Sequence, residues 1–221
     1  MSPDRVYRHF CMGARALEVI GERWTLLIVR DLLLGPLRFT DLERGLNDIT
    51  PTRLTARLRL LESEGIVSRD NSKPGRDVWY SLTDAGRDLA PVIDALIVWG
   101  MGHALEGPVD GEPVPPHSTM LGTKVWLNHN APTLPDGLAW VWRFPGDDEF
   151  TLRLGDGAWE VARGGESAAA VTVLTSREAW ARFLTTPRER RRLPTADITL
   201  EGSRSELRRF AKGFRAEFAA R

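Results

Sequence analysis

The helix predicted over residues 51–63 carries, on its polar side, side chains that can contact a nucleic-acid duplex. At about 100° per residue, the face opposite its leucines holds Thr52, Ala56, Arg59 and Ser63. A guanidinium can donate two hydrogen bonds to one guanine or one phosphate, and threonine and alanine methyl groups can pack against the methyl group of thymine. The residue types on this face therefore indicate a surface that contacts base edges and phosphates.

The flanking residues predict where this helix and the one before it begin and end. Thr40 and Glu43 have the S/T-x-x-E spacing of a capping box, which predicts a helix start. Thr50 and Pro51 predict a second start, because the hydroxyl can cap a helix and proline is tolerated at the first helical position. Gly65 is expected to end the second helix, since glycine readily adopts the left-handed conformation.

A buried stripe and a hairpin complete the predicted unit. The stripe consists of leucines that recur at i, i+4 and i+7, namely Leu54, Leu58 and Leu61. After Gly65, residues 66–69 and 78–82 predict two strands around a basic loop. Two helices, a short turn and a strand pair in this order predict a winged helix-turn-helix, whose second helix enters the major groove.

The second helix and the wing supply the predicted DNA contacts. Residues expected near base edges or adjoining phosphates are Thr50, Thr52, Arg53, Thr55 and Ala56. Residues expected on phosphates are Arg57 and Arg59 in the helix and Lys73 and Arg76 in the wing. The alternative for the arginines is the solvated face of an ordinary amphipathic helix. The agreement of caps, turn, helix and basic wing favours the DNA-binding interpretation.

Five segments follow one known family pattern in order: CMGARALEVIGERWTLL (11–27), GPLRFTDL (35–42), ITPTRLTARL (49–58), LESEGIV (61–67) and YSLTDAG (80–86). Through them, residues 11–99 resemble the HxlR family of bacterial winged-helix regulators, relatives of the MarR type. The resemblance implies a homodimer that binds an inverted repeat, usually as a repressor. It also implies that the N-terminal segment and the helix after the wing form the dimer.

The pattern after the wing is compatible with that dimer. Thr83 can cap a long helix that reaches to about Leu105. Its apolar positions are wider than one stripe: Leu89, Val92, Ile93, Leu96, Ile97 and Trp99. We therefore expect the helix to pack on two sides, against a partner subunit and against a second domain. A two-fold dimer would match a palindromic operator.

The overall charge gives no support for nucleic-acid binding. Thirty Lys and Arg are balanced by thirty Asp and Glu, and residues 51–80 hold six basic and four acidic residues. A strongly basic footprint is the usual signature of such binding. Because non-specific affinity rests mainly on phosphate neutralisation, we expect binding that needs a matched operator and is lost at moderate salt.

The length and composition predict two domains. A chain of 221 residues exceeds the common size of one domain. We expect a winged helix-turn-helix and dimerisation domain over 1–105, a linker rich in proline and glycine over 106–117, and a second domain over 118–221. No apolar run long enough for a membrane span or signal peptide occurs, so a cytoplasmic protein is expected. The single cysteine excludes an internal disulfide.

The second half alternates apolar and polar residues in short runs. This pattern predicts strands around residues 138–144, 150–154, 159–161, 171–173 and 198–200. Asp156-Gly157 indicates a hairpin turn. Ser176, and a capping box formed by Ser203 and Glu206, predict two helices. The simplest arrangement is an antiparallel sheet with helices covering one face, which makes the fold class α+β.

Three motifs in this half, FTLRLGDG (150–157), AAVTVLTSREAW (169–180) and ITLEG (198–202), resemble a sterol-carrier-protein-like domain. The resemblance implies a cavity for an apolar effector between sheet and helices. The aromatic residues that would line it are Trp126, Trp140, Trp142, Phe144, Phe150, Trp159, Trp180, Phe183, Phe210 and Phe214. The alternative is that these rings fill a solid core, since periodicity does not distinguish a filled core from a hollow one.

Cys11 is the one residue with plausible switching chemistry. It matches the position at which several HxlR-like regulators sense quinones, aldehydes or oxidants, so the resemblance implies a redox site here. A thiolate near a helix N-terminus or a basic group is reactive, and Arg5, Arg8 and Arg15 are close in sequence. The alternative is a small hydrophobic residue at the dimer contact.

The sequence gives no support for catalysis. The four histidines occur singly, and no HExxH, CxxC, GxSxG or P-loop is present. We therefore expect no catalytic residues, no metal site and no cofactor. Two interpretations remain for a DNA-binding regulator. In the first, a hydrophobic small molecule bound in the second domain releases the operator. In the second, no small-molecule pocket exists, and Cys11 thiol chemistry or expression level controls activity.

Overall fold

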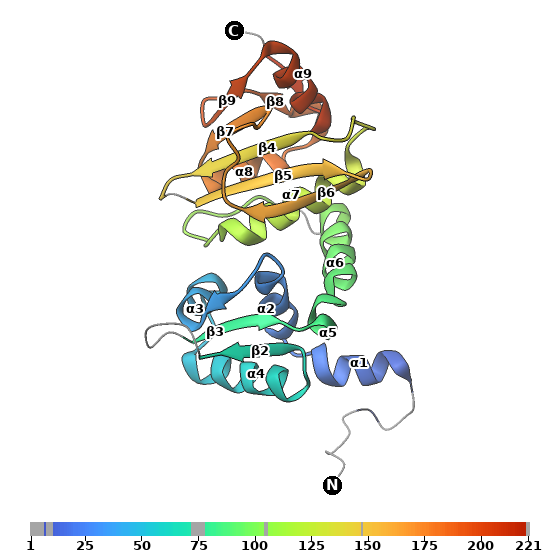
Figure 1. The fold of residues 1–221 in the computed structure, drawn as a ribbon, viewed down its shortest axis with the longest axis vertical. Coiled ribbons are helices and arrows are strands. Elements are labelled where there is room, and N and C mark those ends of the chain that lie inside the picture. Colours follow the sequence, from blue (N-terminus) through green and yellow to red (C-terminus); the bar gives the residue numbers. More distant parts are fainter. Residues whose placement is uncertain (1–6, 8–10, 72–77, 104–105, 147, 220–221) are drawn as a thin grey trace. The chain divides into compact units, whose positions relative to one another are not determined.

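The structure is a computed structural model that describes residues 7, 11–71, 78–103, 106–146 and 148–219. The chain divides into two compact units, Met1–Ile93 and Asp94–Arg221 (Figure 1). This division falls inside a helix, earlier in the chain than the linker expected at 106–117. Both units combine helices with a sheet, so the α+β class is confirmed.

The first unit is a winged helix-turn-helix. Its elements are α1 (Met12–Ile20), α2 (Thr25–Leu32), β1 (Leu37–Arg38), α3 (Phe39–Leu46), α4 (Pro51–Ser63), β2 (Val67–Asp70), β3 (Trp79–Leu82), α5 (Asp84–Arg87) and the first turn of α6 (Ala90–His103). β3 lies between β1 and β2 in an antiparallel sheet. Leu37 faces Tyr80 across one strand pair, and Val67 faces Leu82 across the other.

The local signals around α4 are confirmed. Thr50 is the N-cap, its Oγ1 accepts a hydrogen bond from the Arg53 amide at 3.4 Å, and Pro51 is the first helical residue. The three stripe leucines are buried in the core. At the other end, Gly65 has φ +69°, and Ile66 N–H donates to the carbonyl of Leu61 at 2.9 Å. This closure ends the helix and sends the chain into β2.

The start of α3 differs from the prediction based on Thr40. The helix begins at Phe39, with Arg38 as N-cap and with the carboxylate of Asp41 accepting from the Arg38 amide at 3.2 Å. The earlier start has a tertiary cause. β1 pairs with β3 up to Arg38, so the chain turns into the helix directly after the paired residue.

The long helix predicted from Thr83 is broken in two. Thr83 caps the short α5, where its Oγ1 accepts from the Gly86 amide at 3.1 Å, and α6 begins at Ala90. Pro91 explains the break, because proline has no N–H to donate to the carbonyl of Arg87 and its ring would clash with that carbonyl. The chain therefore turns at residues 88–89.

The second unit holds a mixed sheet. Its elements are the remainder of α6, α7 (Pro116–Asn130), β4 (Ala139–Phe144), β5 (Asp148–Gly155), β6 (Ala158–Arg163), β7 (Val171–Thr175), α8 (Arg177–Thr185), a 3-10 turn (Arg188–Arg190), β8 (Arg192–Leu193), β9 (Ile198–Gly202), α9 (Arg204–Gly213) and β10 (Glu217–Phe218). The five-stranded order is β6-β5-β4-β7-β9, and β4 runs parallel to β7. The prediction of a purely antiparallel sheet was therefore wrong. The local sequence does not show which distant strand pairs with β4.

The local signals of this unit are otherwise confirmed. Asp156 and Gly157 both have positive φ, which is the conformation of a two-residue hairpin turn. Ser176 caps α8 and Ser203 caps α9, each accepting from the backbone amide three residues later. The pattern analysis missed α7, on which His117 and Thr123 are buried as well as Met120 and Trp126. Because polar and apolar positions are buried alike, no amphipathic stripe marks this helix.

Arg191 lies in the interior of the second unit, although the basic run around it suggests a solvated segment. It is 4% exposed. Its guanidinium donates to the carbonyls of Leu184 (2.7 Å), Thr186 (2.9 Å) and Phe214 (3.3 Å), and it lies 4.6 Å over the ring of Trp126. Burial, together with the nearby positive charges of Arg188 and Arg215, lowers the pKa of Arg191 to about 10. Arg191 thus satisfies carbonyls at the ends of α8 and α9.

Candidate nucleic-acid interface

The structure leaves one side of α4 open to solvent. Thr52, Arg53, Ala56 and Arg59 are exposed, and Thr55 is half-buried at the edge facing the wing strands. The leucine stripe fixes this orientation, because Leu54, Leu58 and Leu61 point into the core. The side chains predicted to approach a duplex are therefore accessible on one face.

Arg57 is placed differently from the other helix arginines. Its side chain is 14% exposed and forms an ion pair with Glu22, which lies between α1 and α2. About 100° per residue turns Arg57 toward the leucine side, away from Thr52 and Ala56. The structure therefore does not bring Arg57 together with the open face.

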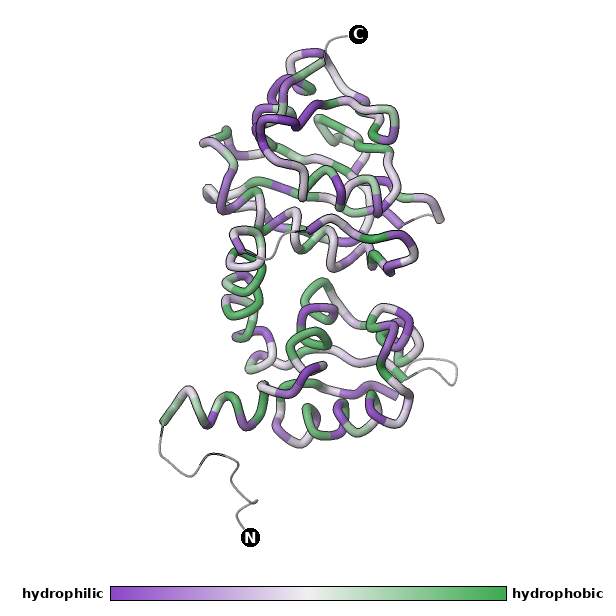
Figure 2. The backbone as a smooth tube through the Cα atoms, turned by 180° about the vertical axis from the view of Figure 1, so that it is seen from behind, coloured by the Kyte–Doolittle hydropathy of each residue, from purple (hydrophilic) through white to green (hydrophobic). Residues whose placement is uncertain are grey.

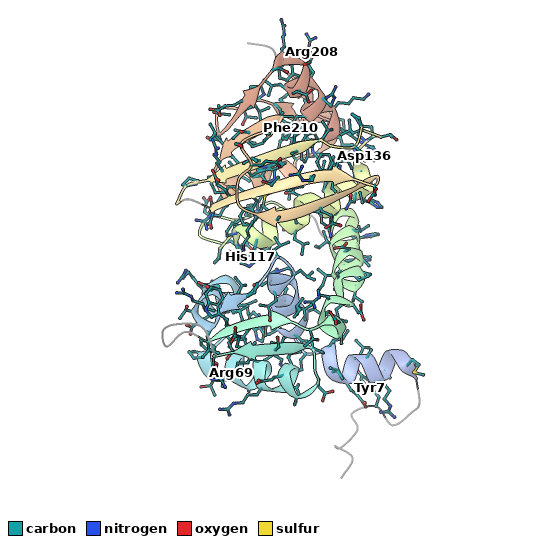
Figure 3. The ribbon with its side chains drawn as sticks, in the orientation of Figure 1. Tyr7, Arg69, His117, Asp136, Arg208 and Phe210 are labelled. Atoms are coloured by element: carbon teal, nitrogen blue, oxygen red, sulfur yellow. The ribbon has the colours of Figure 1, made fainter. Side chains whose placement is uncertain are left out.

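A further cation lies on the wing side of α4. Arg69 of β2 is exposed (Figure 3). With Arg59, it lines a hollow of about 220 Å³ that also includes Thr55 and Tyr80. Burial raises the pKa of Tyr80, an effect that the positive charge of Arg69 partly offsets. Sequence reasoning missed Arg69. Its strand has only four residues and no regular alternation, with Val67 buried and both Ser68 and Arg69 exposed, so the sequence pattern did not single out Arg69.

Three arginines on this surface form no ion pair with the residues that the structure describes. For the described part of the chain, no ion pair is found for Arg53, Arg59 or Arg69. Unpaired guanidinium groups are available to bind phosphate oxygens. The two predicted wing contacts, Lys73 and Arg76, lie outside the described residues.

The aromatic residues predicted to line an effector cavity come together in the second unit. Trp140 and Trp142 of β4 face the helices, with ring centroids 4.7 Å from Phe210 and 5.2 Å from Trp180. Phe214 lies near the same cluster, 5.1 Å from Trp180. Figure 3 shows Phe210 against the sheet, while Arg208 of the same helix projects outward.

These contacts are those of a packed aromatic core. The remaining predicted rings, Trp126, Phe144, Phe150, Trp159 and Phe183, are also buried. Two of the set reach the margin of a hollow. Trp126 lines an apolar groove beside α6, and Phe183 lines a smaller hollow beside Arg182 and Arg190. An effector cavity among the ring faces stays a prediction.

The remaining candidate chemistry is limited. Cys11 is exposed at the N-cap of α1 and forms no disulfide. Over the described ranges, no group of three His, Cys, Asp or Glu side chains is arranged to hold a metal ion. None of the helices in those ranges is both long and apolar enough to cross a bilayer.

The comparisons with known proteins agree on the first part of the chain. The family model described as HxlR-like helix-turn-helix matches residues 19–107. An uncharacterized HTH-type transcriptional regulator of Mycobacterium tuberculosis, Rv3095, is 49% identical over 88 residues, covering 39% of this chain and 54% of that protein. The chain thus spans about half the length of this relative.

Two further relatives are matched over most of their own length. The uncharacterized HTH-type transcriptional regulator YvaP of Bacillus subtilis is 40% identical over 87 residues, covering 38% of this chain and 80% of that protein. Among solved structures, the reduced form of the transcriptional regulator YodB from B. subtilis is 30% identical, covers 45% of this chain and 100% of that chain, and superposes with a TM-score of 0.38.

Proposed function

Because the chain belongs to the HxlR-like helix-turn-helix family of transcriptional regulators, we propose that it is a sequence-specific DNA-binding regulator. We propose further that it acts as a homodimeric repressor on an inverted-repeat operator, without catalytic activity of its own, in the cytoplasm. The observation that carries the proposal is the open face of α4, where Arg53 and Arg59 stand without ion-pair partners among the described residues.

The residues on that face divide into those that would contact bases and those that would bind phosphates. Thr52, Arg53 and Ala56 lie at the N-terminal end of α4, the end by which a recognition helix enters the major groove. They would contact base edges. Arg59 and Arg69 lie toward the wing strands and would bind phosphates of the flanking backbone. The specific contacts would then come from one end of the helix and the positioning contacts from its side.

Exposed apolar residues on two helices support a homodimer. On α1, Met12 and Leu17 are exposed, and on α6, Val92, Leu96 and Trp99 are exposed at i, i+4 and i+7. Figure 2 shows α6 as strongly hydrophobic along much of its length. A contiguous apolar stripe on a helix favours burial against a partner. A second copy would cover it symmetrically and pair two α4 helices with two half-sites.

The second unit would provide the regulatory input. We propose that it is a sterol-carrier-protein-like domain that binds an apolar effector and thereby lowers operator affinity. The support is its mixed sheet with aromatic residues facing the helices and the apolar groove beside α6. The alternative is a regulator without a small-molecule pocket that responds through Cys11, whose thiol is exposed.

DNA selection tests the central proposal. The purified protein is incubated with a random duplex library, and bound sequences are amplified and read. An enriched inverted repeat is expected. The Arg53→Ala variant should bind it at least tenfold more weakly, while Arg208→Ala, an exposed arginine on α9, should bind like the parent. No enrichment, or equal losses for both variants, would contradict the proposal.

Oligomeric state is tested separately. Sedimentation should show a dimer for the parent protein and a monomer for Leu96→Glu, because a carboxylate in the apolar stripe of α6 cannot be buried without a partner charge. A Leu96→Glu protein that sediments like the parent would exclude this stripe as the dimer contact.

A further inference from the structure

An apolar groove runs between three helices of the second unit. Its lining residues are Ile97, Gly100 and Met101 of α6, Thr119, Gly122 and Trp126 of α7, and Ala181, Leu184 and Thr185 of α8. Its volume is about 280 Å³. All of the lining residues follow Asp94, so the groove lies entirely within one compact unit.

The groove offers no charge and little hydrogen bonding. None of its lining residues carries a charge. The hydroxyl of Thr119 donates to the carbonyl of Pro115 at 2.9 Å, and that of Thr185 donates to the carbonyl of Arg182 at 3.0 Å. Both hydroxyls are therefore used within their own helices, and the groove is expected to prefer uncharged, apolar ligands.

Two glycines keep the groove open, and the fold itself does not require either of them. Gly100 and Gly122 lie inside helices, where glycine costs roughly 1 kcal/mol relative to alanine. Neither has a positive φ, and a Cβ added at either position would meet no atom within 4 Å. Backbone conformation and close packing therefore do not explain these glycines. Their effect is to leave space between α6 and α7.

The size of the groove indicates its occupant. A helix with its side chains is about 10–12 Å across, so three turns of a partner helix need far more room than this groove offers. Small-molecule sites begin at about 300 Å³. The groove is of that order, which fits one small molecule of about two or three fused or linked rings and argues against a second copy of the chain.

The position of the groove on α6 connects it to the DNA-binding unit. The first turn of α6, up to Ile93, belongs to the winged-helix unit, and the rest belongs to the second unit. Lys124 of α7 pairs with Asp94 of α6 at 3.4 Å, one turn before Ile97. A ligand that contacts Ile97 and Met101 therefore acts on the helix that continues directly from the winged-helix unit.

We propose that this groove is the effector site, that it takes an uncharged aromatic or polycyclic apolar molecule, and that occupancy changes DNA affinity through α6. The proposal rests on the proposed regulatory function. For such a ligand to alter DNA binding, its affinity for the DNA-bound protein must differ from its affinity for the DNA-free protein.

The test uses N-phenyl-1-naphthylamine, an uncharged fluorescent probe with three aromatic rings in two linked parts, added to the full-length dimer. We expect saturable binding with one site per chain. Gly122→Leu should weaken it at least tenfold, because the new side chain enters the open space. Gly102→Leu is the matched control, since Gly102 lies on α6 outside the groove and also has no neighbour within 4 Å of an added Cβ.

DNA binding by the same proteins separates the two proposals. Gly122→Leu should bind the selected duplex as tightly as the parent, while the probe should change the affinity of the parent only. A parent that binds DNA but not the probe, or a Gly122→Leu protein that binds the probe normally, overturns the groove assignment. A folded parent that binds no DNA would instead contradict the proposed function. Unfolding curves for each variant show whether it is folded, so that a loss of probe affinity in Gly122→Leu can be assigned to the groove.

Discussion

Replacing Arg59 by glutamine should change the salt dependence of DNA binding, whereas the same replacement at Arg57 should not. Both residues lie on α4 and carry the same charge. Their surroundings differ, because Arg57 is 14% exposed and paired with Glu22, whereas Arg59 is exposed with no ion-pair partner among the described residues. Only Arg59 is therefore placed to neutralise a phosphate.

The expected magnitude follows from counterion release. Each neutralised phosphate contributes about 0.9 to the slope of log K against log salt. A dimer carries two copies of Arg59, so Arg59→Gln should lower the slope by about 2. Between about 50 and 200 mM salt, the parent would then lose about tenfold more affinity than the variant. Arg57→Gln should leave the slope unchanged.

Fluorescence anisotropy with the selected duplex at a series of salt concentrations measures these slopes. Glu22→Gln provides a further control, because it releases Arg57 from its partner without removing any cation. The reasoning is refuted if Arg57→Gln and Arg59→Gln lower the slope equally, since the ion pair of Arg57 would then have no bearing on its contact with DNA.

Three further predictions concern the fold. Arg191→Met should lower the free energy of unfolding by roughly 2–4 kcal/mol, because three carbonyls lose their hydrogen-bond donor. Urea titrations measure this change, and unchanged stability would show that these hydrogen bonds are dispensable. The pKa of Tyr80 is raised by burial, so its contribution to stability is present below pH 10 and is lost as the pH rises above that value. The stability of the parent relative to Tyr80→Phe should therefore fall as the pH rises above about 10, and a constant difference would contradict this. Thr50→Ala should cost about 1 kcal/mol through loss of the α4 cap, and Thr50→Ser should cost less.

The local part of the fold could be predicted because its signals lie within a few residues of one another. Thr50, Pro51 and Gly65 mark the ends of α4 through their own hydroxyl, ring and backbone preferences. Asp156-Gly157 specifies its hairpin turn in the same way. Such features depend little on the rest of the chain, and the structure confirms them.

The candidate interface could be predicted only in part. The periodicity of α4 placed the leucines inside and Arg53 and Arg59 outside, as observed. It did not show that Arg57 pairs with Glu22, because the approach of that loop to α4 is a long-range contact. It also did not single out Arg69, which joins the surface only because β2 packs beside α4.

The sequence alone determined both ends of α4, the caps of α8 and α9, the Asp156-Gly157 turn and the family resemblance of the first part of the chain. The tertiary structure alone decided that β4 runs parallel to β7, that Arg191 is buried among carbonyls, and that α7 is a helix buried without an amphipathic stripe. The physical reason is range: caps and turns act between neighbouring residues, whereas strand pairing and burial depend on residues that are distant in the chain.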